Sequence, residues 1–203
     1  MVSLLTPTIW RSCRALANFK RLALLKGLAE SEACTVSELA HAQRVSIGLC
    51  SDYLRVLSAR GLLRVTRRSR WVYYAVGADP DVRHAAPLLA VICRTLKRCQ
   101  RVSEIKALHY DLTSFTHPRR IEILRQLYLH GTMTVTQLSR CCAISLPALH
   151  RHLDKLKRRR VVHQNEDGYV LYKKQHPVVR TILKIITADL PHSGQKSATL
   201  REV

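Results

Sequence analysis

The chain has 203 residues, a length that suits two small domains better than one. Apolar residues make up 47%, enough for two hydrophobic cores, and no apolar run is long enough to cross a bilayer, which argues against a disordered or membrane-spanning chain. The formal net charge of +20 opposes folding by self-repulsion and therefore favours a polyanionic partner. A membrane surface is the competing polyanion, but no strongly basic amphipathic helix stands at either end.

Seven cysteines show no Cys-x-x-Cys pair and no regular spacing. An odd number of cysteines without the spacing of a disulfide framework indicates a reducing environment. We therefore expect buried cysteines and a cytoplasmic, nucleoid-associated protein. Cys141 and Cys142 are interpreted as buried structural residues rather than as a redox or metal pair, because neighbours on a helix point in different directions. We expect no cofactor and no bound metal.

An internal repeat organises the chain: residues 16–74 align without a gap on residues 115–173. The shared positions are mostly apolar at helical spacing, which predicts two copies of one domain with the same core plan. Identical pairs include Leu25 with Leu124, Thr35 with Thr134, Ser46 with Ser145, Leu54 with Leu153, and Leu57 with Leu156.

The first copy, placed at residues 10–78, is predicted to hold three helices and a β-hairpin. Ser37 and Ser46 are the expected N-caps of the second and third helices. Stretches rich in β-forming residues on both sides of Arg67–Arg70 predict the hairpin. In order, the elements are a helix at 14–29, an extended piece at 34–36, helices at 38–43 and from Ser46 to about Arg60, and strands at 62–66 and 71–76.

A connector at residues 79–112 is predicted to be one long helical stretch. Pro80 suits its first turn, and Pro87 is expected to kink it.

The second copy, placed at residues 113–190, repeats the pattern and adds a C-terminal helix. Thr136 and Ser145 are the expected N-caps, and Asp167-Gly168 predicts a two-residue hairpin turn. The expected elements are helices at 118–129, 137–142, from Ser145 to about Arg159, and 177–190, an extended piece at 133–135, and strands at 161–164 and 169–173. Residues 191–203 are expected to form a loose tail.

The predicted fold class is therefore mainly α with small β-hairpins: two tandem winged helix-turn-helix domains joined by a long helical segment.

The segment Ser145-Leu146-Pro147-Ala148-Leu149-His150-Arg151-His152-Leu153-Asp154-Lys155-Leu156 resembles the recognition helix of ArsR/SmtB-type winged-helix repressors. The common pattern there is Ser-x-Pro-x-apolar-Ser-x-His-Leu-x-x-Leu. Residues 46–57 resemble it more loosely, with Gly48 at the proline position and Tyr53 at the histidine. The resemblance implies a DNA-binding transcriptional repressor that pairs through its first and last helices. The pair can form between the two units of one chain or between two chains.

The resemblance also bears on metal binding. Metal-sensing members carry cysteines at positions where this chain has Thr35, Ser37, Thr134 and Thr136. Hydroxyl groups are poor ligands for soft metals, so we expect neither copy to have that thiolate site. Asp81 with His84 is only a fragment of that family's other metal site.

The third helix of each copy is expected to enter a major groove, and the first hairpin to contact phosphate or a narrow minor groove. In the first copy the candidate DNA-binding residues are Ser46, Ile47, Ser51, Asp52, Arg55, Arg64, Arg67, Arg68 and Arg70. In the second copy they are Ser145, Leu146, His150, Arg151, Lys155, Arg158 and Arg159. Arg151 suits bidentate recognition of guanine, whereas His152 is expected to pack inward. The acidic Glu166-Asp167 tip of the second hairpin should avoid phosphate.

No glycine-rich phosphate loop or catalytic motif is present, so we expect a protein that is not an enzyme. The main hypothesis is a sequence-specific regulator that binds double-stranded DNA, most simply a repressor. The alternatives are a winged-helix protein-interaction module and an RNA-binding pair of winged helices.

Overall fold

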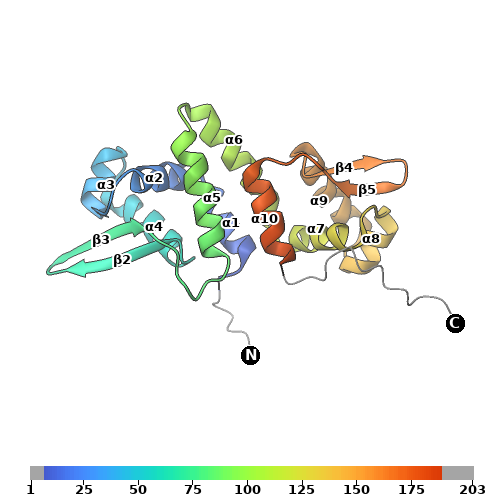
Figure 1. Ribbon diagram of the computed structural model, residues 1–203, viewed down its shortest axis with the longest axis horizontal. Helices are drawn as coiled ribbons and strands as arrows, with labels where there is room; N and C mark the ends of the chain where they lie inside the picture. Colours follow the sequence, from blue (N-terminus) through green and yellow to red (C-terminus); the bar gives the residue numbers. More distant parts are fainter. Residues whose placement is uncertain (1–6, 189–203) are drawn as a thin grey trace. The chain divides into compact units, whose positions relative to one another are not determined.

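The chain is mostly helical and carries two small antiparallel sheets (Figure 1). The computed structural model describes residues 7–188. Within them the chain divides into two units: unit 1 comprises residues 7–117 and 176–182, and unit 2 comprises residues 118–175 and 183–188. None of the helices in this range combines the length and the apolar character needed to cross a bilayer.

Unit 1 follows the predicted order of helices and hairpin. Its elements are α1 (Ile9–Leu16), α2 (Phe19–Ala29), β1 (Cys34–Thr35), α3 (Val36–Ala42), α4 (Ile47–Ser58), β2 (Leu63–Arg68), β3 (Trp71–Val76), α5 (Ala85–Arg98), α6 (Val102–Leu112) and the 3-10 turn η1 (Thr113–Phe115). The sheet order is β1-β3-β2, so β1 extends the hairpin by one short strand.

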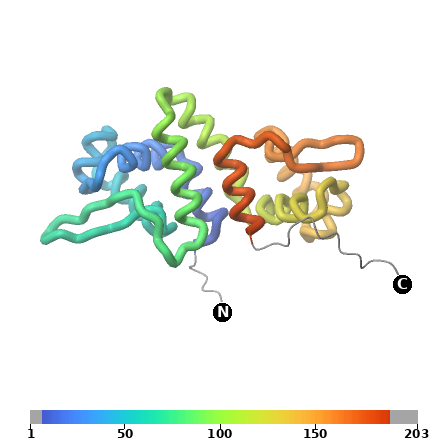
Figure 2. The backbone as a smooth tube through the Cα atoms, in the orientation of Figure 1, coloured from blue at the N-terminus to red at the C-terminus, as the bar shows by residue number. Residues whose placement is uncertain are grey.

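Unit 2 repeats the core of this order with a two-stranded sheet. Its elements are α7 (Pro118–His130), α8 (Val135–Cys142), α9 (Leu146–Arg158), β4 (Val162–Asn165) and β5 (Gly168–Leu171). Helix α10 (Pro177–Thr187) is divided between the two units after residue 182. The last residues of the helix predicted at 177–190, and the tail predicted at 191–203, lie outside the described residues. The backbone course of all these elements is followed most easily in Figure 2.

The first predicted helix is wrong as a single element, because the chain breaks between α1 and α2. Asn18 has extended backbone angles, and its side-chain oxygen accepts a hydrogen bond from the Arg21 backbone N–H at 3.0 Å. Asn is a strong N-cap, so this side chain begins a new helix where the apolar periodicity alone predicted continuity.

The N-caps predicted for the second helix of each copy are also wrong, by two residues. Thr35 and Thr134, not Ser37 and Thr136, precede α3 and α8. In each case a reciprocal capping box forms with the side chain three residues later, Glu38 or Gln137. Both hydroxyls accept from the backbone N–H of that residue at 3.3 Å. The box satisfies two free backbone donors at once, which favours the earlier start.

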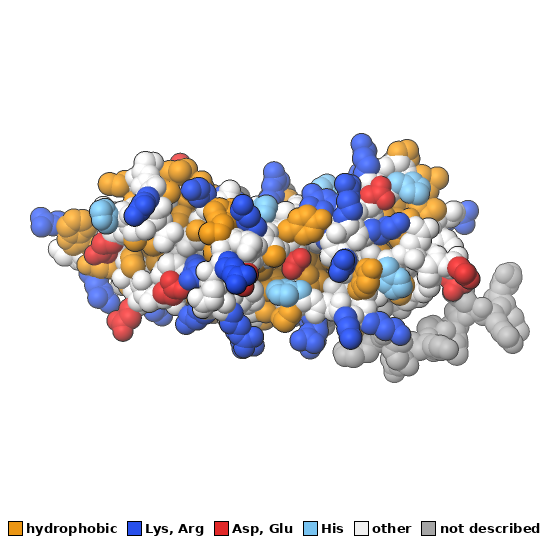
Figure 3. Space-filling model, turned by 90° about the horizontal axis from the view of Figure 1, so that it is seen from above, with side chains coloured by type: hydrophobic (Ala, Val, Ile, Leu, Met, Phe, Trp, Pro, Cys, Tyr) orange, Lys and Arg blue, Asp and Glu red, His pale blue; other side chains and the backbone are white. Residues whose placement is uncertain are grey.

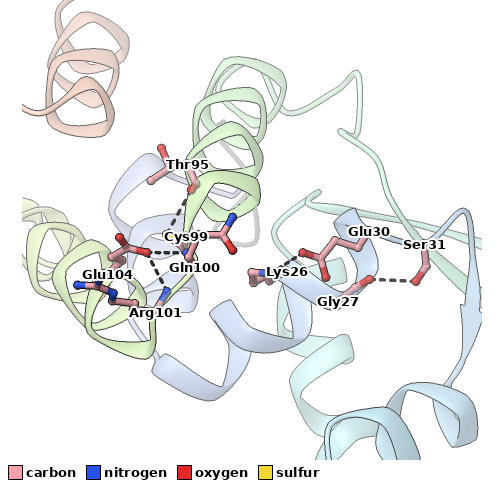
Figure 4. Close-up of polar contacts among 9 residues, drawn as sticks. All are labelled: Lys26, Gly27, Glu30, Ser31, Thr95, Cys99, Gln100, Arg101 and Glu104. Carbon is pink, nitrogen blue, oxygen red and sulfur yellow. Dashed lines mark hydrogen bonds and ion pairs between the residues drawn. The ribbon is translucent and has the colours of Figure 1, made fainter.

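The connector predicted as one helical stretch is two helices, α5 and α6. Helix α5 begins five residues after Pro80, and Pro87 lies in its first turn, where proline needs no kink. The break follows Cys99, whose backbone is extended. The Glu104 carboxylate accepts from the backbone N–H groups of Gln100 and Arg101, at 2.6 and 2.9 Å, and so fixes the start of α6 (Figure 4).

Both hairpins differ in detail from the prediction. In unit 1, Arg68 pairs with Trp71, so Arg67 and Arg68 belong to β2 and the turn is Ser69–Arg70. In unit 2, Asn165 pairs with Gly168, so the turn is Glu166–Asp167 and not Asp167–Gly168. The β-pairing of Met133 with Tyr169 brings the part of β5 next to the turn against the loop before α8.

Each unit has its own apolar core at the repeated positions. Leucines that match one another in the repeat are buried in both copies, each at most 1% exposed. These pairs are Leu25 and Leu124, Leu28 and Leu127, Leu54 and Leu153, and Leu57 and Leu156. The helix that precedes each turn, the helix that follows it and the hairpin therefore have fixed positions within a unit.

Candidate nucleic-acid interface

A helix-turn-helix forms in each unit with the same local geometry. The turn after α3 contains Arg44, and the turn after α8 contains Ala143, both with left-handed backbone angles. The next residue in each turn donates its backbone N–H back to the first helix: Val45 to the Ala40 carbonyl at 3.0 Å, and Ile144 to Ser139 at 3.1 Å. This pattern ends one helix and starts the next within a few residues, which is what a helix-turn-helix requires.

In unit 1 the start of α4 presents an apolar surface. Ser46 is the N-cap as predicted, and its hydroxyl accepts from the Leu49 backbone N–H at 3.3 Å. Ile47 is 58% exposed, and Gly48 beside it faces open space. Ser51, a predicted contact residue, is only half-exposed.

The one arginine predicted to read bases in unit 1 is already paired. Arg55 donates to the Asp52 carboxylate at 2.7 Å, and both side chains are well exposed. An exposed ion pair of this kind is weak, but it places a negative charge on the outer face of α4.

In unit 2 the first turn of α9 is apolar, as in α4, and the exposed polar residues His150 and Arg151 follow in the second turn. Ser145 occupies the N-cap position but makes no side-chain capping bond there, and Pro147 lies in the first turn. His150 and Arg151 are exposed, and across residues 7–188 neither side chain makes a hydrogen bond or an ion pair. Leu146, 47% exposed, is the apolar member of this surface. His152 is half-buried, in agreement with the predicted inward packing.

The far end of α9 concentrates positive charge. Lys155 and Arg159 are half-buried, and Arg158 is exposed. Arg120 from α7, only 5% exposed, adds a fourth charge that the sequence argument missed. Burial and then the Arg159 charge lower the pKa of Arg120 to about 10. Burial first, then the charges of these three arginines, also lower the pKa of Lys155. Arg120 matches Arg21 in the repeat, so the alignment could have identified it.

The unit 1 hairpin is a cationic surface. Its four predicted contact residues, Arg64, Arg67, Arg68 and Arg70, are all exposed. The guanidinium of Arg68 lies 5.5 Å from the ring centre of Tyr73, and that of Arg70 lies 5.7 Å from Trp71. These aromatic rings hold two of the cations in place without neutralising them.

The unit 2 hairpin lacks such charge. Its turn carries Glu166 and Asp167, both exposed. Lys157, from α9, lies 5.8 Å from the Tyr169 ring centre and donates to the Gln164 side chain at 3.0 Å. Figure 3 shows lysine and arginine side chains at many separate points on one face of the molecule.

A family model described as a helix-turn-helix domain matches residues 115–165, which span α7, α8, α9 and β4. The chain is also similar to the transcriptional repressor PagR of Bacillus anthracis, with 30% identity over 76 residues. That alignment covers 37% of this chain and 76% of PagR. The chain belongs to the helix-turn-helix transcriptional regulators. It is accordingly a DNA-binding regulator.

The structure of this helix-turn-helix regulator also bears on the cysteine pair and on the candidate metal residue His84. The prediction that Cys141 and Cys142 are buried is wrong, because Cys141 is exposed and Cys142 is half-buried at the C-terminal end of α8. The candidate metal residue His84 instead has its ring Nε2 2.8 Å from the Ser12 hydroxyl, and burial lowers its pKa. Within residues 7–188, no group of three or more His, Cys, Asp or Glu residues is placed to hold a metal ion.

Proposed function

We propose that this regulator is a sequence-specific repressor that binds double-stranded DNA through two tandem winged helix-turn-helix domains. The recognition helices, α4 and α9, enter major grooves, and the unit 1 hairpin lies on the phosphate backbone or in a minor groove. The observation that carries the proposal is the recurrence, in one chain, of a helix-turn-helix followed by an antiparallel hairpin. The repressor role is supported by the name of the relative PagR.

The charge distribution supports DNA as the partner. Four exposed arginines occupy the unit 1 hairpin, and residues 63–76 contain no carboxylate. Phosphate contacts release counterions from the duplex, so binding through these arginines should weaken steeply with added salt. A protein-interaction module of the same net charge would also bind random duplex DNA nonspecifically, but its salt dependence would not rest on these four arginines in particular.

The decisive experiment is a salt titration of duplex binding with the variant Arg67→Ala/Arg68→Ala/Arg70→Ala. We expect weaker binding to every sequence, and a log–log salt slope that is shallower by up to about 3, because each lost phosphate contact contributes about 0.9. The matched control removes three exposed arginines, two from α5 and one from the junction before α6: Arg94→Ala/Arg98→Ala/Arg101→Ala. Equal slopes for the two triple variants would contradict the placement of the hairpin on DNA.

A competition experiment distinguishes RNA from duplex DNA as the partner. Helix-in-groove reading needs the wide major groove of B-form DNA, which A-form RNA lacks. Structured RNA should therefore compete poorly with duplex DNA at equal phosphate concentration.

The mass of the protein–DNA complex will distinguish one chain acting as an internal pair from a dimer of chains.

A further inference from the structure

We infer that the two units have different roles on DNA: α9 of unit 2 reads base edges, whereas unit 1 holds the phosphate backbone through its hairpin. This inference rests on the proposed function and adds to it which surface determines specificity. It follows from comparing the two copies position by position, since the same fold presents different chemistry in each.

The charges of the two copies are distributed in opposite ways. The recognition segment of unit 1, residues 46–60, carries two arginines and one aspartate, whereas residues 145–159 of unit 2 carry five lysines and arginines against one aspartate. The hairpins reverse this order. Residues 63–76 hold four arginines and no carboxylate, and residues 162–171 hold two carboxylates and neither lysine nor arginine. Each unit therefore offers one cationic surface, and it is the hairpin in unit 1 but the helix in unit 2.

A reversed charge pair lies at the centre of both recognition helices. The repeat places Asp52 opposite Arg151 and Arg55 opposite Asp154. In unit 1 this produces the Asp52–Arg55 ion pair, which occupies the arginine and turns a carboxylate outward. In unit 2 the Arg151 guanidinium is exposed and makes no hydrogen bond or ion pair within the described residues. A free guanidinium at this position can bind guanine O6 and N7 together.

The remaining exposed positions of α4 add little base discrimination. Ile47 and Leu49 are 58% and 41% exposed, and Gly48 carries no side chain. Apolar groups in the major groove can recognise only the thymine methyl group. The Ser46 hydroxyl already caps its own helix. The matching positions of α9, Leu146 and Pro147, are apolar too, so the two helices differ one turn later. There unit 2 has His150 and Arg151 where unit 1 has Ser51 and Asp52, and the Ser145 hydroxyl makes no capping bond.

A DNA site for this chain should therefore contain one short sequence motif next to a stretch of relaxed sequence. Base contacts confer specificity, while phosphate contacts supply affinity without sequence preference. The relaxed stretch is where the unit 1 hairpin binds. A symmetric reader would instead select two copies of the same motif.

The test is selection of bound sequences from a random duplex pool with three full-length proteins: the unsubstituted chain, Arg151→Ala and Arg55→Ala. The two variants are matched because each removes one exposed guanidinium from a recognition helix. We expect Arg151→Ala to lose the preference at one or two adjacent positions and to bind the best site on the order of 10-fold more weakly. Arg55→Ala should select the same motif as the unsubstituted chain.

Different outcomes overturn the inference and the proposed function. No salt-sensitive binding to any duplex would contradict the proposed function itself. Binding to duplex DNA in which Arg55→Ala changes the motif and Arg151→Ala does not would overturn only the division of roles. Enrichment of two equivalent motif copies by a complex whose mass shows a single chain would overturn it as well. Unchanged circular dichroism of both variants excludes misfolding as the reason for either result.

Discussion

Gly168 lies where the unit 2 hairpin comes closest to the loop before α8. Its φ is +140°, and a Cβ at this position would be 2.4 Å from the Met133 carbonyl oxygen. Both the backbone conformation and the close approach therefore require glycine. The hairpin signal in the sequence included Gly168, but the reason for glycine is the neighbouring backbone, which no local pattern reveals.

Gly168→Ala should destabilise unit 2 by at least about 1–3 kcal/mol, the usual cost of an unfavourable backbone conformation, with the clash added. The measurement is urea unfolding followed by circular dichroism. Gly48→Ala is the control, because a Cβ added at Gly48 would have no neighbouring atom within 4 Å and alanine favours a helix by about 1 kcal/mol. A Gly168→Ala protein as stable as the parent would show that this hairpin does not approach Met133 so closely.

Residue chemistry also explains which site residues could be predicted. Arg64, Arg67, Arg68 and Arg70 were predictable because four arginines on a hairpin must be exposed. The pairing of Arg55 with Asp52 was not, since spacing permits the ion pair but does not require it. The repeat alignment identifies Arg120 as the counterpart of Arg21, but only the tertiary structure shows that Arg120 is buried, at 5% exposed.

At the scale of elements, the capping boxes decide where α3 and α8 begin. Thr35→Ala and Thr134→Ala should each cost about 1 kcal/mol of stability in their own unit, the usual effect of losing an N-cap oxygen. Ser37→Ala and Thr136→Ala, which remove hydroxyls from inside the helices, serve as controls and should have little effect. Equal losses from both pairs of variants would contradict the observed caps. The measurement is chemical denaturation of each variant.

The two boxes should respond differently to acid. Hydrogen bonds from the Thr35 backbone and hydroxyl lower the pKa of Glu38 below its usual value. The stabilisation is therefore present above the pKa of the unfolded state and is lost as the pH falls through the lower pKa of the folded state. Gln137 has the same role in unit 2 and does not titrate. Glu38→Gln should remove this part of the pH dependence.

The measurement is the stability difference between Glu38→Gln and the parent protein from about pH 7 to about pH 3, a range that spans the titration of a carboxylate. Because the carboxylate bonds are lost on protonation, the difference should shrink as the pH falls. Gln137→Glu is the reciprocal control and should introduce an acid-sensitive component in α8. A stability difference that does not change with pH would contradict the role given to Glu38.

The order of helices and strands was largely predictable from the sequence, but the points at which two predicted helices are divided were not. Periodic leucines predicted helices through residues 14–29, but the Asn18 side chain divides that range into α1 and α2. Glu104 in the same way sets the start of α6. Such breaks depend on single polar contacts, whereas apolar periodicity reports only which face is buried.

At the scale of the whole molecule, the duplicated cores predict that each unit has its own stability. Leu25→Ala and Leu124→Ala remove equivalent, fully buried side chains and should each cost about 2–5 kcal/mol. Hydrogen exchange should then accelerate in α2–α4 for the first variant and in α7–α9 for the second. Acceleration throughout the chain in both variants would show that the units unfold as one.

The reversed charge pair of α4 and α9 has a consequence for how a gene's control region is arranged. Two identical readers fit a palindrome and are indifferent to its orientation. A single chain with Asp52 on α4 and Arg151 at the matching position of α9 is not self-symmetric, so under the proposed function an operator that binds one chain has a polarity. Inverting that operator relative to the promoter would exchange which unit faces the transcription start, and repression should then depend on the direction of the site as well as on its sequence.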